Sequence, residues 1–341
     1  MPAELSRSNQ PVITLNDRLR AIFFLLRPHQ YYKNFLVFFG LFFSRNLFKT
    51  ELWFPIVLAF IVLCLTSSLN YLINDFRDRE KDRHHPEKKN RPFPSGTISN
   101  FFGLLIALLL SLFIVIILII LPPSPIISSG AYDEVIEQGS ISNPSKAAFI
   151  LVLGGFFITS QIYSLFLKRV VFADTIMISV NYVWRAIAGA VLINVYVSPW
   201  LIILCFITAM MLSLAKRKGD FSILKEKAIQ HKQVFEKYTP ELLDQSLATS
   251  AAIELLAVFI YLVDRHPNET VFIVLALPLF TFAIFRYLFL VSGNSIVGRR
   301  AERLFFDKQL LLVGITILLL FFIAIYYPNF LDNLLGIPDP P

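Results

Sequence analysis

Cysteine and charged residues are both scarce in this chain of 341 residues. The only two cysteines, Cys64 and Cys205, lie inside apolar runs, and no CxxC or His/Cys spacing accompanies them. This pattern indicates packing residues and argues against a disulfide framework or a metal pair. Asp, Glu, Lys and Arg make up only 16% of the chain, whereas soluble domains have about 25%. The composition therefore disfavours a soluble domain.

Three functional patterns are also absent from the sequence. The polar N-terminal tail has no signal-peptide pattern. No GxxxxGK loop is present, which disfavours a nucleotide triphosphatase. No nucleic-acid motif accompanies the net charge of +7, so we expect no nucleic-acid partner. We interpret that charge as a topology signal and as an attraction to anionic lipid.

Apolar residues make up 56% of the chain, and 34 residues are Phe. Apolar runs long enough to cross a bilayer predict an all-α polytopic membrane bundle of about nine transmembrane helices. The first run begins near Leu19. We expect a tail at 1–18, one membrane domain at 19–330 with an extracytoplasmic insertion at 122–146, and a C-terminal tail at 331–341. The predicted spans are 34–48, 53–73, 100–121, 147–166, 172–193, 199–215, 244–263, 270–290 and 309–328.

Positive charge is distributed unevenly between the two sets of loops. Of the 31 Lys and Arg residues, 25 lie in the N-terminal tail and in the loops after the even-numbered spans. The opposite loops hold only Arg45, Lys49, Lys146 and Arg265. The positive-inside rule then predicts a cytoplasmic N-terminus and cytoplasmic even-numbered loops. We expect a multi-pass protein of the cell membrane.

The stretch from Asn70 to Gly96 is the most informative part of the sequence. If the preceding helix continues through it, Asn74, Asp78 and Asp82 cover only about 80° of one helix face, with Asp75 beside them. Like charges at this spacing repel. A Mg²⁺ ion would offset the repulsion, because it binds through carboxylates and substrate phosphates. The alternative is a solvated acidic helix end balanced by nearby basic residues.

Cations and a few other polar residues gather on the predicted cytoplasmic side. A site for a diphosphate substrate needs such cations, because they donate charge-assisted hydrogen bonds to phosphate oxygens. For the charged loop that starts at Lys216, a positive-inside anchor is the alternative. The candidate residues outside the aspartate stretch are Lys33, Tyr163, Lys168, Asp174 and Lys216, and those within it are Lys88 and Arg91.

Two ionisable residues lie within predicted spans. Arg185 is a functional candidate by its position, and its alternative role is a salt bridge between helices. Small residues follow it and predict close helix packing, namely Ala186, Ala188, Gly189 and Ala190. Glu254 faces either a polar cavity or an arginine, and the sequence leaves this choice open.

These motifs resemble the UbiA prenyltransferase superfamily, whose members are nine-helix, Mg²⁺-dependent membrane enzymes. The pattern N-D-x-x-D-x-x-x-D at 74–82 is similar to the first aspartate-rich motif of the superfamily. A finer resemblance is to the decaprenyl-phosphate phosphoribosyltransferase branch, in which we match His85 to the family histidine. It rests on RPHQYYKNFLVFFGLFFS (27–44), NDFRDREKDRHHPEKKNRP (74–92), YSLFLKRVVFADTIMISVNYVWRAIAGA (163–190), LAKRKGDF (214–221) and FRYLFLVSGNSIVGRRAERLFFDKQLL (285–311).

The resemblance implies roles for the candidate residues. Asn74, Asp78 and Asp82 would hold Mg²⁺ on the donor pyrophosphate, with Asp75 close by. Tyr163 and Asp174 would form a second motif, and Asp174 joins the three metal ligands as a catalytic candidate. The substrate-binding candidates are Lys33, Asp75, Lys88, Arg91, Tyr163, Lys168, Arg185 and Lys216.

The implied reaction is Mg²⁺-dependent transfer of 5-phosphoribose from phosphoribosyl pyrophosphate to a polyprenyl phosphate, for cell-envelope glycan synthesis. One rival is prenyl transfer from a prenyl diphosphate to an aromatic or glycerol-phosphate acceptor. Another is a lipid flippase or transporter, which would favour charges along a path through the membrane. The polyprenyl chain length and the oligomeric state are left open, a homo-oligomer included.

Overall fold

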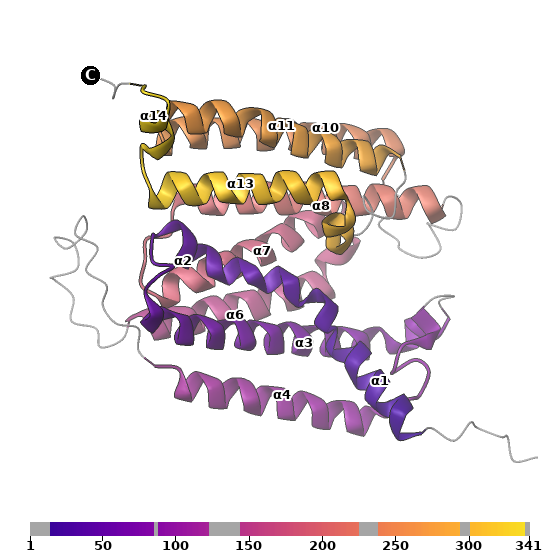
Figure 1. Ribbon diagram of the computed structural model, residues 1–341. Helices are drawn as coiled ribbons and strands as arrows, with labels where there is room; N and C mark the ends of the chain where they lie inside the picture. The colour runs from indigo at the N-terminus through magenta and orange to yellow at the C-terminus, as the bar shows by residue number, and fades with distance from the viewer. Residues whose placement is uncertain (1–13, 85–87, 123–143, 225–237, 294–300, 338–341) are drawn as a thin grey trace, which may run out of the picture. The chain divides into compact units, whose positions relative to one another are not determined.

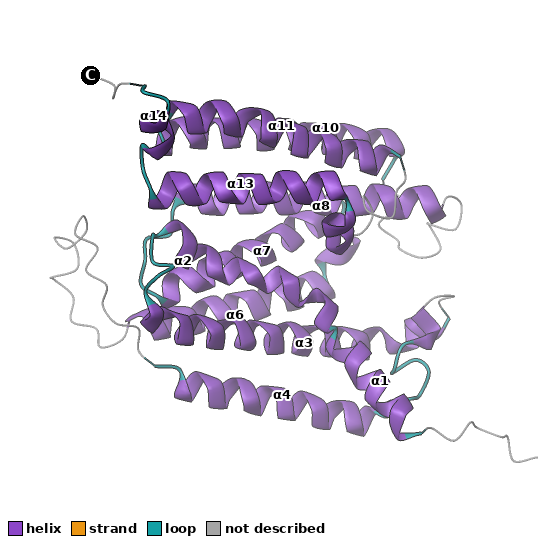
Figure 2. Ribbon diagram, in the orientation of Figure 1, coloured by secondary structure: helices purple, strands orange, loops and turns teal. Residues whose placement is uncertain are grey.

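The computed structural model describes residues 14–84, 88–122, 144–224, 238–293 and 301–337. Within these ranges all regular structure is helical, as Figures 1 and 2 show, which confirms the all-α prediction. Three sequence predictions fall outside the described residues, namely the histidine at position 85, most of the insertion at 122–146, and the residues 225–237 of the charged loop.

Among the described residues, eight helices are long and apolar enough to cross a membrane, and each coincides with a predicted span. The prediction of a multi-pass membrane protein is therefore confirmed, whereas the side on which the N-terminus lies stays a prediction. The eight are α3 (Trp53–Arg83), α4 (Asn100–Ile120), α6 (Pro144–Leu165), α7 (Ala173–Leu192), α8 (Pro199–Leu224), α10 (Pro240–Arg265), α11 (Thr270–Ser292) and α13 (Lys308–Tyr326).

The remaining predicted span, 34–48, is not one long α-helix. The chain forms α1 (Leu15–Leu26), then the 3-10 helix η1 (Pro28–Phe38), then the short α2 (Phe39–Phe43). Helix α1 ends at Arg27, whose φ of 54° is left-handed. Pro28 follows, and the residue before a proline is disfavoured in the α region. A proline junction therefore separates α1 from residues 34–48, and the predicted run from near Leu19 is broken at this point.

The chain divides into two compact units. Unit 1 comprises Met1–Tyr31 and Cys64–Ile116, and unit 2 comprises Tyr32–Leu63 and Ile117–Pro341. Unit 1 therefore contains α1, the C-terminal part of α3, the 3-10 helix η3 (Lys88–Asn90) and α4. Its core joins Ala21 and Leu25 of α1, Leu72 of α3, and Ile106 and Leu110 of α4.

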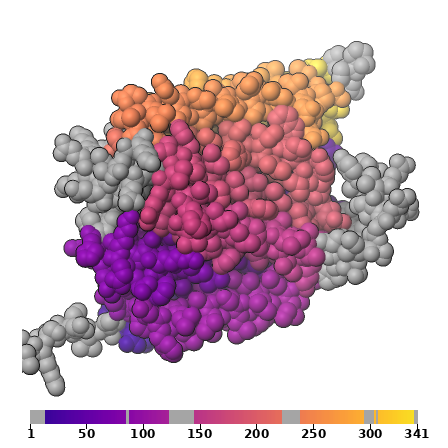
Figure 3. Space-filling view, turned by 180° about the vertical axis from the view of Figure 1, so that it is seen from behind, coloured from indigo at the N-terminus to yellow at the C-terminus, as the bar shows by residue number. Residues whose placement is uncertain are grey.

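Unit 2 is a bundle in which helices that follow one another in the chain pack together. Helix α7 contacts α6 and α8, α8 contacts α10, and α10 contacts α11 (Figure 1). From behind, in Figure 3, the salmon side chains of α8 lie next to the orange ones of α10 and α11. Helix α13 and the short α14 (Phe330–Leu334) both pack against α11. In a bilayer, van der Waals packing between these helix faces and hydrogen bonds between helices hold such a bundle together.

Helix α7 approaches η1 and α2 at backbone distance within unit 2. A Cβ atom added to Gly189 would overlap the carbonyl oxygen of Val37, and one added to Gly40 would lie 2.8 Å from the Cα of Ala190. Ala186, Ala188 and Ala190 are buried. The prediction that these small residues permit close packing is confirmed.

Candidate active site

Helix α3 runs unbroken to Arg83, so the whole aspartate motif lies on one helix of unit 1. The predicted i, i+4, i+8 spacing of Asn74, Asp78 and Asp82 is therefore present in the structure. Asp75 and Asp82 are each only 3% exposed. These two carboxylates are therefore not solvated, and they need partners because a buried charge is costly.

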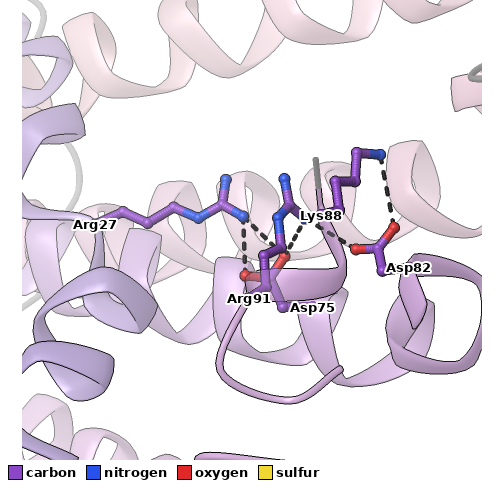
Figure 4. A network of polar contacts seen from close by, with 5 residues as sticks. All are labelled: Arg27, Asp75, Asp82, Lys88 and Arg91. Atoms are coloured by element: carbon purple, nitrogen blue, oxygen red, sulfur yellow. Dashed lines mark hydrogen bonds and ion pairs between the residues drawn. The ribbon is translucent and has the colours of Figure 1, made fainter. Parts of the chain in front are cut away.

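Three cations satisfy these two carboxylates (Figure 4). Arg27 Nη2 donates to both oxygens of Asp75, at 2.8 and 2.9 Å. Arg91 Nη1 lies 3.0 Å from Asp75 Oδ1 and 3.1 Å from Asp82 Oδ2. Lys88 Nζ lies 3.6 Å from Asp82 Oδ1. We call these five residues the aspartate network.

The local fold explains how Arg27 reaches α3. Its backbone N–H bonds to the carbonyl of Phe23 in the left-handed turn that ends α1. Its guanidinium then stacks on the ring of Tyr71 at 4.7 Å and meets Asp75. Sequence analysis did not assign Arg27 a role, and the proline that follows it was the available signal for a chain turn at this point.

A buried phenylalanine positions the loop that carries Lys88 and Arg91. The ring of Phe93 packs edge-on against Phe76 at 5.6 Å, and it fills the space that a side chain at Gly103 would need. Burial lowers the pKa of Lys88 below its ordinary value, while the nearby Asp82 acts in the opposite direction. The two predicted cations are thus held beside the predicted acids.

In unit 2, Asp174 is completely buried, and its carboxylate accepts hydrogen bonds from two side chains. Arg217 Nε donates to Asp174 Oδ2 at 2.6 Å, and the Tyr238 hydroxyl donates to Oδ1 at 3.0 Å. The same hydroxyl accepts the N–H of Phe172, whose φ is 61°. Burial raises the pKa of Tyr238 to about 12, and the negative charge of Asp174 contributes to this rise. We call Asp174, Arg217 and Tyr238 the Asp174 cluster.

Sequence analysis predicted Asp174 and chose Lys216 as a site residue, but it paired Asp174 with neither Arg217 nor Tyr238. Lys168 lies in the 3-10 helix η4 (Leu167–Arg169), which contacts both α6 and α7.

Arg185 lies buried inside unit 2. Its Nε donates to Asn34 Oδ1 at 2.8 Å, and its Nη1 donates to the carbonyl of Asn181 at 2.6 Å. The guanidinium also stacks on Phe156 at 4.5 Å. Lys33 lies 5.8 Å from the Tyr182 ring, so η1 presents polar side chains to α7.

Glu254 of α10 binds across to α8. It lies 2.5 Å from the hydroxyl of Thr208, and it is 7% exposed. Its second oxygen, Oε2, has no hydrogen-bond partner in the part of the chain that the structure describes. Cys205 lies within electrostatic range of both Glu254 and Arg185.

The aspartate network has the donor chemistry of a Mg²⁺ site. No group of three or more His, Cys, Asp or Glu is arranged for a metal among the described residues. Yet Asp75 and Asp82 each aim an oxygen at the single nitrogen Arg91 Nη1, at 3.0 and 3.1 Å. Carboxylate oxygens converging on one positive group are the hard ligands that Mg²⁺ prefers. The residues fit the metal, provided that the guanidinium leaves.

The fold and this helix define a polytopic α-helical membrane protein with paired acidic and basic residues at one helix end. Comparison with known proteins points to a class of transferases. Residues 34–132 match the model of the UbiA prenyltransferase family. A decaprenyl-phosphate phosphoribosyltransferase from Mycobacterium tuberculosis is 24% identical over 85% of this chain and 89% of its own length. One from Corynebacterium glutamicum is 24% identical, over 83% and 80%.

Solved structures show the same fold. A UbiA homologue from Archaeoglobus fulgidus bound to GPP and Mg²⁺ covers 90% of this chain and 99% of its own, with a TM-score of 0.61 and 19% identity. Another structure of that homologue is bound to Cd²⁺, with a TM-score of 0.57 and 18% identity. The predicted resemblance to the UbiA prenyltransferases is confirmed, and the similarity to the phosphoribosyltransferases supports an enzyme.

Proposed function

We propose that this enzyme transfers 5-phosphoribose from phosphoribosyl pyrophosphate to a polyprenyl phosphate. A phosphate oxygen of the lipid forms a bond to C1 of the ribose as the bond from C1 to pyrophosphate breaks. The products are polyprenyl-phosphoryl-5-phosphoribose and pyrophosphate. The acceptor phosphate is already ionised at neutral pH, so the reaction needs no strong general base.

The names of the relatives support this choice of substrates. Those in Mycobacterium and Corynebacterium are called decaprenyl-phosphate phosphoribosyltransferases, and this chain aligns with more than three quarters of each. We propose the same class of donor and acceptor here, on the cytoplasmic face of the cell membrane, with the product used for a cell-envelope glycan.

The observation that carries the proposal is the aspartate network in unit 1. Two buried carboxylates and three cations meet there at the end of a membrane-spanning helix (Figure 4). A donor diphosphate bound with a divalent metal presents both positive and negative charge, so it complements both kinds of side chain.

We assign the metal to Asn74, Asp78 and Asp82, with Asp75 beside them. When bound, Mg²⁺ neutralises charge that develops on the leaving pyrophosphate. Lys88 and Arg91 would donate to its phosphate oxygens. Positioning and charge stabilisation then supply most of the rate acceleration.

In unit 2, the proposed phosphate contacts are Lys33, Lys168, Arg185 and Lys216. Tyr163 and Asp174 form the second motif. Because Asp174 is buried against Arg217 and Tyr238, we propose that its catalytic contribution is to position these two side chains.

A second candidate function is prenyl transfer from a prenyl diphosphate to an aromatic or glycerol-phosphate acceptor. The observation that favours it is the fold similarity to the homologue bound to GPP and Mg²⁺. The metal motif would then hold the diphosphate of a lipid rather than that of a sugar.

Purified protein in detergent with Mg²⁺ distinguishes the two functions. One reaction receives polyprenyl phosphate and phosphoribosyl pyrophosphate, and the other receives a prenyl diphosphate with a panel of acceptors. We expect pyrophosphate and a chloroform-soluble ribosylated lipid in the first reaction only. Product in the second reaction alone would overturn the phosphoribosyl assignment and leave the metal motif in place.

A further inference from the structure

Arg91 occupies an unusual position above α3. Its Nη1 donates to Asp75 and to Asp82, which are seven residues apart in the helix. Seven residues rise about 10.5 Å along a helix axis, so the two side chains must lean towards the turn between them. That turn carries Asp78. The guanidinium therefore lies where a cation shared by the aspartate motif would lie.

The structure gives Arg91 the freedom to leave this position. The side chains of Asp75 and Asp82 are each 4% exposed, whereas that of Arg91 is 32% exposed. The arginine thus covers the carboxylates from the outside. Its backbone is held by the packing of Phe93, so the long side chain can rotate away without movement of the loop.

Arg27 is placed differently from Arg91. It binds both oxygens of Asp75 and stacks on Tyr71, and its backbone is fixed by the turn that ends α1. When Arg91 leaves, Asp75 keeps this partner. Asp82 keeps Lys88, at the longer distance of 3.6 Å. Asp82 therefore loses its closest cation.

A metal and the guanidinium compete for the same oxygens. Mg²⁺ binds oxygen at 2.0–2.1 Å, so an ion on Asp82 Oδ2 would lie close to Arg91 Nη1, and the two positive charges would repel each other. A metal arriving alone must displace Arg91 and leave it without these partners. A metal arriving with a diphosphate brings new acceptors, because arginine binds phosphate in a bidentate manner.

We propose that Arg91 occupies the cation position of the aspartate motif in the substrate-free enzyme and moves to the diphosphate when metal and diphosphate bind together. This inference rests on the proposed metal site. It makes Arg91 a coupling residue that holds back metal binding in the absence of a diphosphate. Coupling between two ligands is reciprocal, so the metal promotes diphosphate binding to the same extent.

The test measures binding rather than turnover, with Mn²⁺ as a spectroscopic substitute for Mg²⁺. Full-length protein in detergent is titrated with Mn²⁺ alone, followed by electron paramagnetic resonance. Binding of radiolabelled pyrophosphate is then measured at saturating Mn²⁺. The variants are Arg91→Gln, Arg91→Lys and the control Arg79→Gln. Arg79 lies on α3 and contacts Phe76 and Glu80 but neither carboxylate of the network.

We expect Arg91→Gln to change the two affinities in opposite directions. Mn²⁺ alone should bind roughly fivefold tighter, and pyrophosphate should bind roughly fivefold weaker. A fivefold change is the low end of the range typical of coupling between two ligands. Arg91→Lys keeps a charge between the carboxylates, so its binding of Mn²⁺ alone should stay near that of the unaltered protein. Arg79→Gln should change neither affinity.

Weaker or unchanged binding of Mn²⁺ alone by Arg91→Gln overturns the proposal. If Arg91 were merely structural, its loss would weaken the binding of both ligands. Thermal unfolding of each variant separates a folding defect from a binding effect. If Arg91→Gln binds Mn²⁺ more tightly and pyrophosphate more weakly although phosphoribosyl pyrophosphate is not a donor, the proposed movement of Arg91 is supported. In that case only the proposed substrate is wrong.

Discussion

The two charged clusters use the same chemistry at different depths. In the aspartate network of unit 1, cations that are 21–32% exposed cover buried carboxylates. In the Asp174 cluster of unit 2, the carboxylate is 0% exposed and the arginine side chain only 5% exposed. The first set of cations can exchange partners with solvent or a ligand, and the second arginine cannot.

This difference assigns different tasks to the two motifs. A buried ion pair is costly to assemble and more costly to break on one side, so it holds a fixed geometry. A partly exposed pair contributes little to stability and can be replaced by a ligand. We therefore expect substitutions in the Asp174 cluster to affect folding, and substitutions in the aspartate network to affect binding and turnover.

The largest expected effect comes from breaking the buried pair. Arg217→Gln should lower the free energy of unfolding by about 3–5 kcal/mol, because Asp174 is left buried without its cation. Chemical unfolding in detergent measures this loss. The control is Lys218→Gln on the next residue, whose pair with Asp244 is partly exposed and contributes about 0–1 kcal/mol. Equal losses of unfolding free energy in the two variants would contradict the expected difference between the buried pair and the partly exposed pair.

Removing one carboxylate of the aspartate motif should instead abolish turnover in a folded protein. We expect Asp78→Asn or Asp82→Asn to lower the Mg²⁺-dependent rate by roughly 100-fold or more, because a metal ion supplies several kcal/mol of charge stabilisation. Product formation and thermal unfolding are measured together. Glu80→Gln, on the exposed side of α3, is the matched control. Undiminished turnover in both Asp variants would contradict the metal assignment.

A methyl group added to α7 tests how tightly unit 2 is packed. Gly189→Ala should destabilise the protein by about 1–3 kcal/mol, because backbone atoms of Val37 cannot give way. Gly103→Ala in unit 1 meets only the side chain of Phe93 and should cost less. Gly154→Ala is the control, since nothing lies within 4 Å of its added Cβ. Thermal unfolding ranks the three, and a different order contradicts the prediction.

The smallest expected effect concerns the tyrosine of the Asp174 cluster. Tyr238→Phe should lower the free energy of unfolding by about 1 kcal/mol, the typical contribution of a hydrogen bond. The raised pKa of Tyr238, about 12 against an ordinary 10, adds a pH signature. Its contribution is fully present below pH 10 and is lost as the pH rises to 12, because only the unfolded tyrosine ionises readily in that window.

The unaltered protein should therefore lose more stability between pH 10 and 12 than the Tyr238→Phe variant does. Unfolding measured at several pH values in this window makes the comparison. Tyr327→Phe serves as a control, since the side chain of Tyr327 is exposed. If Tyr238→Phe and the unaltered protein lost the same stability between pH 10 and 12, Tyr238 would not be the source of the pH dependence.

Length and hydropathy determined most of the helices. Apolar runs bounded by polar residues predicted eight helices of membrane-spanning length. The exception was 34–48, where hydropathy is uninformative about backbone geometry. There a left-handed residue at Arg27 and the proline after it end α1, and a 3-10 helix follows.

Spacing along one helix also determined much of the candidate site. Residues 74–82 lie on a single α-helix, so their common face follows from helical periodicity alone. Lys88 and Arg91 were found because they follow closely in the chain. The partners Arg27, Arg217 and Tyr238 were not assigned, because they are 48, 43 and 64 residues away from the acids that they bind.

The sequence by itself thus determined the membrane class, the helices and the aspartate face, since these depend on local periodicity. Only the tertiary structure decided which cation meets which carboxylate and how deeply each pair is buried. Those properties depend on packing between distant segments, such as the contact of Phe93 with Phe76 and Gly103 that positions Arg91. Burial then separates a pair that a ligand can displace from one that holds the fold.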